Sequence, residues 1–358
     1  MKDFFLKDEL RHKAYSWPQT VLHYEFDGDA PHPDTHILCR NGKEVPFQSE
    51  KIAKNRYKLT VLTDLPYLKE YSFCFSKGKS TFQSLHLDNG IINVQSVKGG
   101  LYRAVLKSGE AFSYEVCTKL ALLREEEDFI DGQVENIITK TLIFEGDRKY
   151  KFTLKLKRSL DYLEIYEQME GFSESEAELK ITWENFCPRF RYTLDRGTEP
   201  VDAYLKQDGA FPFYINPFAP RASFWDQRYV SYWDKKRSVW QGICLHDLSA
   251  FDDGEYALWA SNNTLAFSLF ENKITAPIRQ GKRAFMHILR HGNDLQEIGS
   301  LYFRYYSIVS LDKVKDYVLN WESDKNAYPK YFKQTGKCEW GGFYNDYIGD
   351  EATTEDMM

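Results

Sequence analysis

The sequence lacks the long apolar runs and the short motifs that would assign it at once to a common class. No run of about 18 apolar residues is present, so no membrane-spanning helix is predicted. The N-terminus is charged every few positions and has no apolar signal-peptide core. The motifs GxGxxG, GxxxxGK(S/T), HExxH and GxSxG are absent, which excludes the usual nucleotide-binding and hydrolase signatures. We therefore expect no cofactor and no membrane partner.

Cysteine is scarce, and the six cysteines are dispersed without a CxxC pair. They are Cys39, Cys74, Cys117, Cys187, Cys244 and Cys338. Several lie inside apolar runs, which predicts buried free thiols. Thiols of this kind are typical of a reducing compartment, so we expect a cytoplasmic location unless the chain is an excised piece whose leader was removed.

A surplus of basic charge is also missing. The 47 basic and 53 acidic residues are interleaved and give a formal net charge of −6. A nucleic-acid-binding surface would normally need a basic face or stripe. We therefore expect no nucleic-acid partner.

Aromatic residues are abundant, with 24 Tyr, 25 Phe and 8 Trp, or 16% of the chain. Aromatic side chains suit pleated strands, where they pair across the sheet. They also suit surfaces that stack on sugar rings. For any single aromatic residue the structural interpretation is the more common one.

Short β-type runs bounded by turn residues follow one another through most of the chain. The clearest hairpin joins residues 150–157 to residues 162–167, because both alternate apolar and polar side chains. A run over residues 82–87 predicts another strand, and Asp88-Asn89-Gly90 after it predicts a tight hairpin turn. From Asp294 the apolar spacing becomes helical.

These patterns predict a mainly β protein, a large antiparallel β-sandwich with C-terminal helices. The sandwich is expected over residues 1–292, with a small N-terminal β subdomain over residues 1–80 as a further subdivision. Residues 293–358 are expected to form a helical linker and tail.

Three residues are weak candidates for catalysis: His246, Asp247 and His287. An imidazole beside a carboxylate at a strand end can act as a general acid or base. Adjacent strand residues point to opposite faces, however, so His246 and Asp247 need not touch. His287 shares a face with apolar neighbours, which predicts burial. A structural role is favoured for both histidines.

Two polar clusters have simpler interpretations. His32, Asp34 and His36 have a spacing compatible with metal ligation, but a solvated loop is favoured, so we expect no metal site. The acidic run over residues 125–128 is also interpreted as a solvated loop.

The region over residues 186–236 is interrupted by five prolines and is rich in aromatics and arginines. Long irregular regions of this kind carry function more often than the scaffold does. Sugars are bound by stacking on Trp or Tyr while carboxylates, amides and Arg meet the hydroxyls. The candidate sugar-binding residues are Trp225, Asp226, Arg228, Tyr229, Tyr232, Trp233 and Trp240. The alternative is an aromatic-rich strand pair in the core.

Three features together resemble a known module: the segment LDNGIINV at residues 87–94, the long series of amphipathic strands, and the helices that follow. It is similar to the galactose-mutarotase-like β-sandwich, or super-sandwich, that precedes α/α-toroid domains in glycoside hydrolases, carbohydrate phosphorylases and polysaccharide lyases. The resemblance is one of layout over about residues 20–320. It implies that the chemistry sits on a downstream α/α-toroid domain, which would begin near residues 340–344.

Sugar epimerases of the same fold use a histidine pair and a carboxylate. Their histidine-rich strand motif is not found here, so the resemblance does not make His246 and His287 catalytic.

Three functions therefore stay open. The leading one is a carbohydrate-binding or supporting module of a glycoside hydrolase or polysaccharide lyase, with an oligo- or polysaccharide as partner. The second is a self-sufficient sugar epimerase-like or glycan-active enzyme. The third is a structural or interaction protein without a sugar ligand. The sequence does not decide whether this chain catalyses a reaction by itself.

Overall fold

A computed structural model of the chain describes ten stretches. They are residues 4–7, 17–65, 70–173, 176–185, 191–192, 201–202, 229–234, 239–245, 266–268 and 273–291. The described residues form strands, turns and loops, and none of them lies in an α-helix. No helix capable of spanning a membrane occurs in this part of the chain. The predicted tail over residues 293–358, with its helices, lies outside the described residues.

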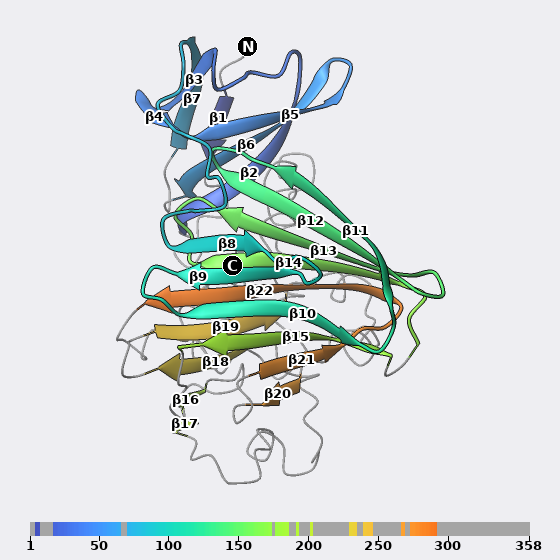
Figure 1. The fold of residues 1–358 in the computed structure, drawn as a ribbon. Helices are drawn as coiled ribbons and strands as arrows, with labels where there is room; N and C mark the ends of the chain where they lie inside the picture. The colour runs from blue at the N-terminus through green and yellow to red at the C-terminus, as the bar shows by residue number, and fades with distance from the viewer. Residues whose placement is uncertain are drawn as a thin grey trace, which may run out of the picture. The chain divides into compact units, whose positions relative to one another are not determined.

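The chain divides into two compact units (Figure 1). The described part of unit 1 comes from Met1–His86 together with Asp131–Asn136. Unit 2 is built from Leu87–Ile130 and Ile137–Tyr302. Unit 1 is therefore discontinuous in sequence, because a segment from the middle of the chain belongs to it.

Unit 1 contains two antiparallel sheets. The four-stranded sheet has the order β1 (Phe4–Lys7), β7 (Glu70–Lys77), β3 (His36–Arg40) and β4 (Lys43–Val45). The three-stranded sheet has the order β2 (Trp17–Asp27), β6 (Arg56–Leu65) and β5 (Phe47–Ala53). Side chains from both sheets form one apolar cluster, which includes Leu38, Phe47, Leu59 and Phe73. This cluster is the core of unit 1.

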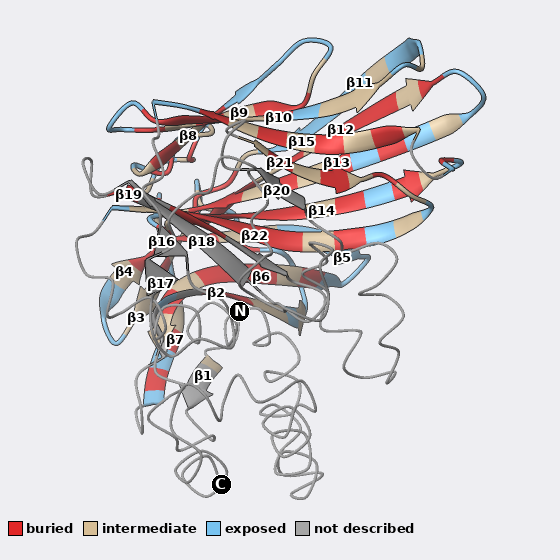
Figure 2. Ribbon diagram, turned by 90° about the horizontal axis from the view of Figure 1, so that it is seen from below, coloured by how far each residue is buried: buried red, intermediate tan, exposed pale blue. Residues whose placement is uncertain are grey.

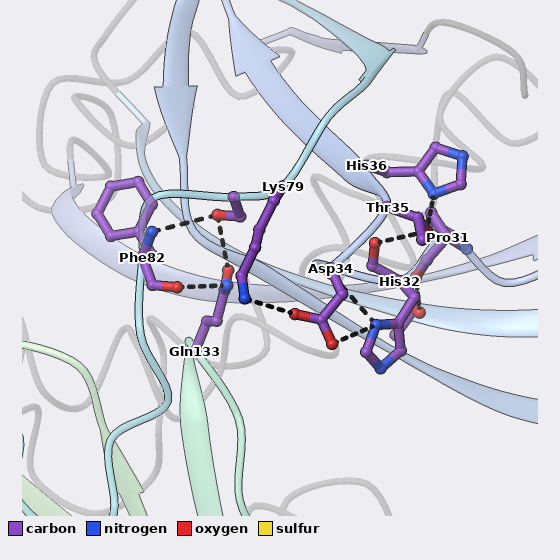
Figure 3. Close-up of polar contacts among 10 residues, drawn as sticks. Pro31, His32, Asp34, Thr35, His36, Lys79, Phe82 and Gln133 are labelled. Carbon is purple, nitrogen blue, oxygen red and sulfur yellow. Dashed lines mark hydrogen bonds and ion pairs between the residues drawn. The ribbon is translucent and has the colours of Figure 1, made fainter.

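The segment Asp131–Asn136 is held in unit 1 by hydrogen bonds to residues far away in sequence. The Gln48 side-chain oxygen accepts the backbone N–H groups of Val134 and Glu135 at 3.0 and 2.9 Å. The Gln133 amide donates to the Phe82 carbonyl at 2.7 Å (Figure 3). Glycine at position 132 allows this close approach, because the Gln48 amide occupies the space that a Cβ atom would need.

Unit 2 contains a six-stranded and a seven-stranded antiparallel sheet. The first has the order β20 (Ala266–Ser268), β21 (Lys273–Pro277), β15 (Ala177–Glu184), β10 (Ala111–Thr118), β9 (Tyr102–Leu106) and β8 (Ile92–Ser96). The second has the order β11 (Leu122–Ile130), β12 (Glu135–Phe144), β13 (Arg148–Lys157), β14 (Tyr162–Glu170), β22 (Gly281–His291), β19 (Val239–Leu245) and β18 (Tyr229–Asp234). A short pair, β16 (Arg191–Tyr192) and β17 (Val201–Asp202), forms a separate ladder.

The two large sheets of unit 2 pack face to face. The ring centroid of Phe152 on β13 lies 5.9 Å from that of Tyr102 on β9 and 5.7 Å from that of Tyr114 on β10. Buried residues recur along β13 and β14 of the seven-stranded sheet (Figure 2) and along β9, β10 and β15 of the six-stranded sheet. The prediction of a mainly β, antiparallel chain is confirmed, and unit 2 is a β-sandwich.

The hairpin predicted from residues 150–157 and 162–167 is confirmed as β13 and β14. The strand predicted over residues 82–87 is wrong, because this stretch is a loop that ends in a turn. A single bridge, Asp88↔Asn93, stands where a hairpin was expected. The cause is Asn89, a buried side chain whose amide donates to the Lys157 and Leu160 carbonyls at 2.6 and 2.8 Å. These hydrogen bonds to distant residues hold the turn, and residues 82–87 do not form a strand.

A charged cluster lies inside the sandwich. Glu167 and Arg283 are opposite each other on β14 and β22 and are only 3% and 1% exposed. Arg283 donates through Nε and through Nη2 to the Glu167 carboxylate, the second bond measuring 2.6 Å. Tyr150 donates its hydroxyl to the same carboxylate at 2.5 Å. Burial lowers the pKa of Arg283, but Glu167 outweighs this effect and raises the pKa above its usual value.

Removing the charge of Glu167 should therefore destabilise the fold strongly. We expect Glu167→Gln to lower the free energy of unfolding by about 3–5 kcal/mol, because the Arg283 charge stays buried without a counter-ion. Urea denaturation measures the effect. The control is Glu115→Gln, since the Glu115–Lys180 pair spans 3.5 Å with side chains 49% and 30% exposed. This control should cost less than about 1 kcal/mol. Equal costs for the two variants would contradict the argument.

Candidate functional site

The predicted sugar-binding segment is described only in part. Trp225, Asp226 and Arg228 lie outside the described residues. Tyr229, Tyr232 and Trp233 belong to β18, and Trp240 belongs to β19.

The backbones of β18 and β19 form an antiparallel pair in which Trp233 and Trp240 are Cα partners. β18 is the last described strand on its side of the seven-stranded sheet. The backbone therefore brings two of the predicted residues opposite each other at the end of this sheet. The segment thus forms a pair of strands, which the alternative interpretation of the sequence also expects.

His287 is fully buried between the two sheets of unit 2, as its apolar neighbours predict. Its Nδ1 lies 2.6 Å from the Tyr114 hydroxyl, and its Nε2 lies 2.8 Å from the side-chain oxygen of Gln241. Burial lowers the pKa of His287 to about 3, so the ring is neutral near pH 7. An oxygen of Gln241 can only accept, so Nε2 carries the proton and Nδ1 accepts from Tyr114. This arrangement favours a structural role. His246 and Asp247 lie outside the described residues.

The turn at Pro31–His36 contains the residues with metal-like spacing (Figure 3). Nδ1 of His32 accepts the Asp34 backbone N–H at 3.2 Å and lies 3.4 Å from the Asp34 carboxylate. His36 bonds instead to the Thr35 hydroxyl at 2.9 Å, and Lys79 lies 3.6 Å from Asp34. No group of three metal-ligating side chains occurs among the described residues. The turn is thus an exposed set of local contacts.

The acidic run over residues 125–128 was predicted to be a loop, and this prediction is wrong. The run lies in β11, which pairs with β12. The Lys140 ammonium is fully buried and lies 2.9 Å from Glu125 and 3.2 Å from Glu127. It also donates to the Val97 carbonyl at 2.8 Å. Alternate acids of the run therefore neutralise one buried cation, which a sequence window could not reveal.

A histidine–carboxylate pair in unit 1 was missed by sequence reasoning. His86 Nδ1 lies 2.5 Å from Asp131, and the side chains are 75% and 21% exposed. The same carboxylate accepts the His86 backbone N–H at 3.0 Å and the Asn136 amide at 2.6 Å. His86 and Leu87 have positive φ angles of 50° and 65°.

Positive φ angles at two consecutive non-glycine residues are costly and often mark functional positions. A carboxylate that orients an exposed imidazole is a common feature of acid–base and metal sites. Asp131 therefore holds one ring nitrogen of His86, while most of the His86 side chain is exposed. The only sequence signal was the histidine itself, because Asp131 is 45 positions away.

No protein-family model and no curated protein matches the chain. An α-mannosidase from Enterococcus faecalis V583 matches in structure with a TM-score of 0.53 and 12% identity, over 86% of this chain and 45% of the mannosidase. A glycosyl hydrolase family 38 protein from Enterococcus faecalis gives 0.49 and 10%, over 86% of this chain and 46% of its own. An α-N-acetylgalactosaminidase from Bifidobacterium bifidum gives 0.37 and 11%, over 63% and 39%.

At 12% identity the match to the α-mannosidase shows a shared fold alone. The chain spans less than half the length of that protein, since 45% of it is covered. The chain, whose described residues are mainly in β-strands, is therefore similar in fold to a part of this α-mannosidase.

The neutral state of His287 predicts a particular pH dependence of stability. Its pKa is about 3 in the folded protein and about 6.5 in an unfolded chain. Between these values the unfolded state binds a proton that the folded state does not, so stability falls as the pH drops below about 6.5. The contribution of one such group is at most about 1.4 kcal/mol per pH unit.

We expect His287→Asn to be less stable near pH 7 and to show a flatter fall in stability between about pH 6 and pH 4, where the wild-type histidine titrates only in the unfolded state. Chemical denaturation at several pH values measures both slopes. The matched control is His291→Asn, because His291 is exposed, and it should keep the wild-type slope. A slope for His287→Asn equal to that of the wild type would show that His287 binds a proton as readily in the folded state as in the unfolded state.

Proposed function

We propose that this chain is a β-sandwich module of a glycan-degrading enzyme, which binds an oligo- or polysaccharide beside a separate catalytic domain. The observation that carries the proposal is the shared fold with an α-mannosidase whose length the chain covers only to 45%. The resemblance of the strand layout to galactose-mutarotase-like sandwiches points to the same class of enzymes. An α/α-toroid is the catalytic partner that this resemblance implies.

The β18–β19 strand pair is the proposed sugar contact. Trp233 and Trp240 are Cα partners in this pair. Side chains of directly opposed residues in antiparallel strands lie about 4.5–5.5 Å apart at Cβ. Two indoles at this spacing would offer an apolar surface to the face of a sugar ring. Asp226 and Arg228, which precede the pair in sequence, would supply hydrogen bonds to hydroxyl groups.

The surroundings of His287 support a module over a self-sufficient catalyst. A general acid or base must reach the proton that it transfers, directly or through one water. His287 is fully buried, and both ring nitrogens are engaged by Tyr114 and Gln241. The module is therefore proposed to bind glycan without turning it over.

Glycan binding tests the proposal. Calorimetric titration of the full chain with mannose-containing and other oligosaccharides should reveal weak binding, and incubation should release no sugar. Loss of an aromatic anchor commonly costs about 2 kcal/mol or more, so Trp225→Ala, Trp233→Ala and Trp240→Ala together should weaken binding by more than about tenfold.

The matched control is Phe129→Ala, because Phe129 is a large aromatic residue that is 47% exposed on β11. This control should bind as the wild type does. Binding that survives the triple substitution would remove the proposed site. Hydrolysis of a glycan by the chain alone would instead support the self-sufficient enzyme.

A further inference from the structure

Cys39 and Cys74 lie directly opposite each other in unit 1. They are Cα partners in the antiparallel pair of β3 and β7. Both thiols are free and half-buried. The residues are 35 positions apart, so the pairing follows only from the strand register.

The register places the two cysteines within reach of a disulfide bond. Opposed residues in antiparallel strands have Cα atoms about 4.5 or 5.5 Å apart, depending on the hydrogen-bonding pattern. Disulfides bridge Cα separations of about 4.4–6.8 Å. The Asn41 backbone N–H donates to the Ser72 carbonyl at 2.9 Å, two positions along both strands. Cys39 and Cys74 therefore occupy a hydrogen-bonded position, the wider of the two types.

The wider position has a chemical consequence. It separates the Cβ atoms slightly more than an unstrained disulfide prefers, so closure needs a small shift of the strands. Disulfides with some strain have less reducing potentials and are opened more readily by thiols than structural ones are. A bridge at this place would therefore be reversible.

The two thiols lie on the face of the sheet that the unit 1 core leaves uncovered. Their strand neighbours Leu38 and Phe73 are 0% and 1% exposed and belong to the core cluster, and successive strand residues point to opposite faces. Burial raises the pKa of Cys39, and the nearby Cys74 and Glu44 raise it further. The effect of Cys74 on the pKa of Cys39 agrees with the strand register.

We propose that Cys39 and Cys74 form a reversible cross-strand disulfide, with hydrogen peroxide as the oxidant and a small thiol as the reductant. One thiol reacts in the small fraction that is deprotonated: its sulfur attacks the peroxide O–O bond, and the leaving hydroxide takes up the thiol proton, giving a sulfenic acid and the first water. The second thiol attacks the sulfenic sulfur, the S–S bond forms, and a second water leaves. Two electrons pass from the thiols to the peroxide.

The bridge would close a loop that contains three strands of unit 1. β4, β5 and β6 all lie between Cys39 and Cys74 in sequence. Constraining this loop reduces the freedom of the unfolded chain and so stabilises the folded state. A reversible bond also fits the reducing compartment that the dispersed cysteines predict, because thiols would keep it open until an oxidant appears.

Peptide mapping of the full chain tests the proposal. The protein is treated with hydrogen peroxide, its remaining thiols are alkylated, and it is digested without reductant. Mass spectrometry should find the Cys39 and Cys74 peptides joined, with the loss of two hydrogen atoms, and dithiothreitol should separate them. The oxidised protein should also unfold at a higher temperature than the reduced protein.

Cys39→Ser and Cys74→Ser should each abolish the joined peptide. Cys117→Ser is the matched control, because Cys117 is also half-buried but its strand partner on β15 is Glu178, and it should keep the joined peptide. Two results would overturn the proposal: alkylation of both wild-type thiols after oxidation, or bonding of either cysteine to a different one. Mapping of the wild-type protein decides this even if a variant folds poorly.

Discussion

The packing of the two large sheets of unit 2 against each other is the constraint on which this structure most depends. Tyr102, Tyr114 and Phe152 fill the space between the sheets with aromatic rings. Large buried aromatics contribute much of the apolar area that stabilises such a core. A buried tyrosine hydroxyl usually finds a hydrogen-bond partner, and the Tyr114 hydroxyl meets His287 on the facing sheet.

Matching of polar groups also fixes the strand register. A slip of one residue would turn every side chain of a strand to the other face. Such a slip between β14 and β22 would turn one of the two partners to the other face, so Glu167 and Arg283 would no longer meet. The Lys140 ammonium imposes the same kind of requirement on β11, since Glu125 and Glu127 must face it. Buried charges thus specify pairings that apolar contacts alone would leave looser.

Features set by local sequence were predictable, and features set by distant partners were not. The period of two over residues 150–157 and 162–167 predicted a hairpin because both strands bury one face. The burial of His287 followed from the same alternation. By contrast, the acidic run of β11 looked solvated because its partner Lys140 lies on another strand. The loop before Asn89 looked like a strand because its apolar content gave no sign of the bonds that hold Asn89.

The candidate sites were likewise predictable only where local sequence determines them. The aromatic composition of the segment around Trp233 was visible in the sequence, and the register adds that Trp233 and Trp240 are Cα partners. The pairs His86–Asp131 and Cys39–Cys74 join residues 45 and 35 positions apart. A single sequence contains no signal that links such residues, because only the strand arrangement brings them together.

The discontinuity of unit 1 has a consequence for how the protein is made. Residues Asp131–Asn136 belong to unit 1, although they are synthesised after the first three strands of the six-stranded sheet. Gln48 and Phe82 form hydrogen bonds with Val134 and Gln133 of this segment, and these bonds can form only after the segment has left the ribosome. The N-terminal unit therefore cannot reach its final structure before the segment Leu87–Ile130 of unit 2 has been translated. Unit 1 is thus the first unit to begin synthesis, but its folding depends on residues that are made after synthesis of unit 2 has begun.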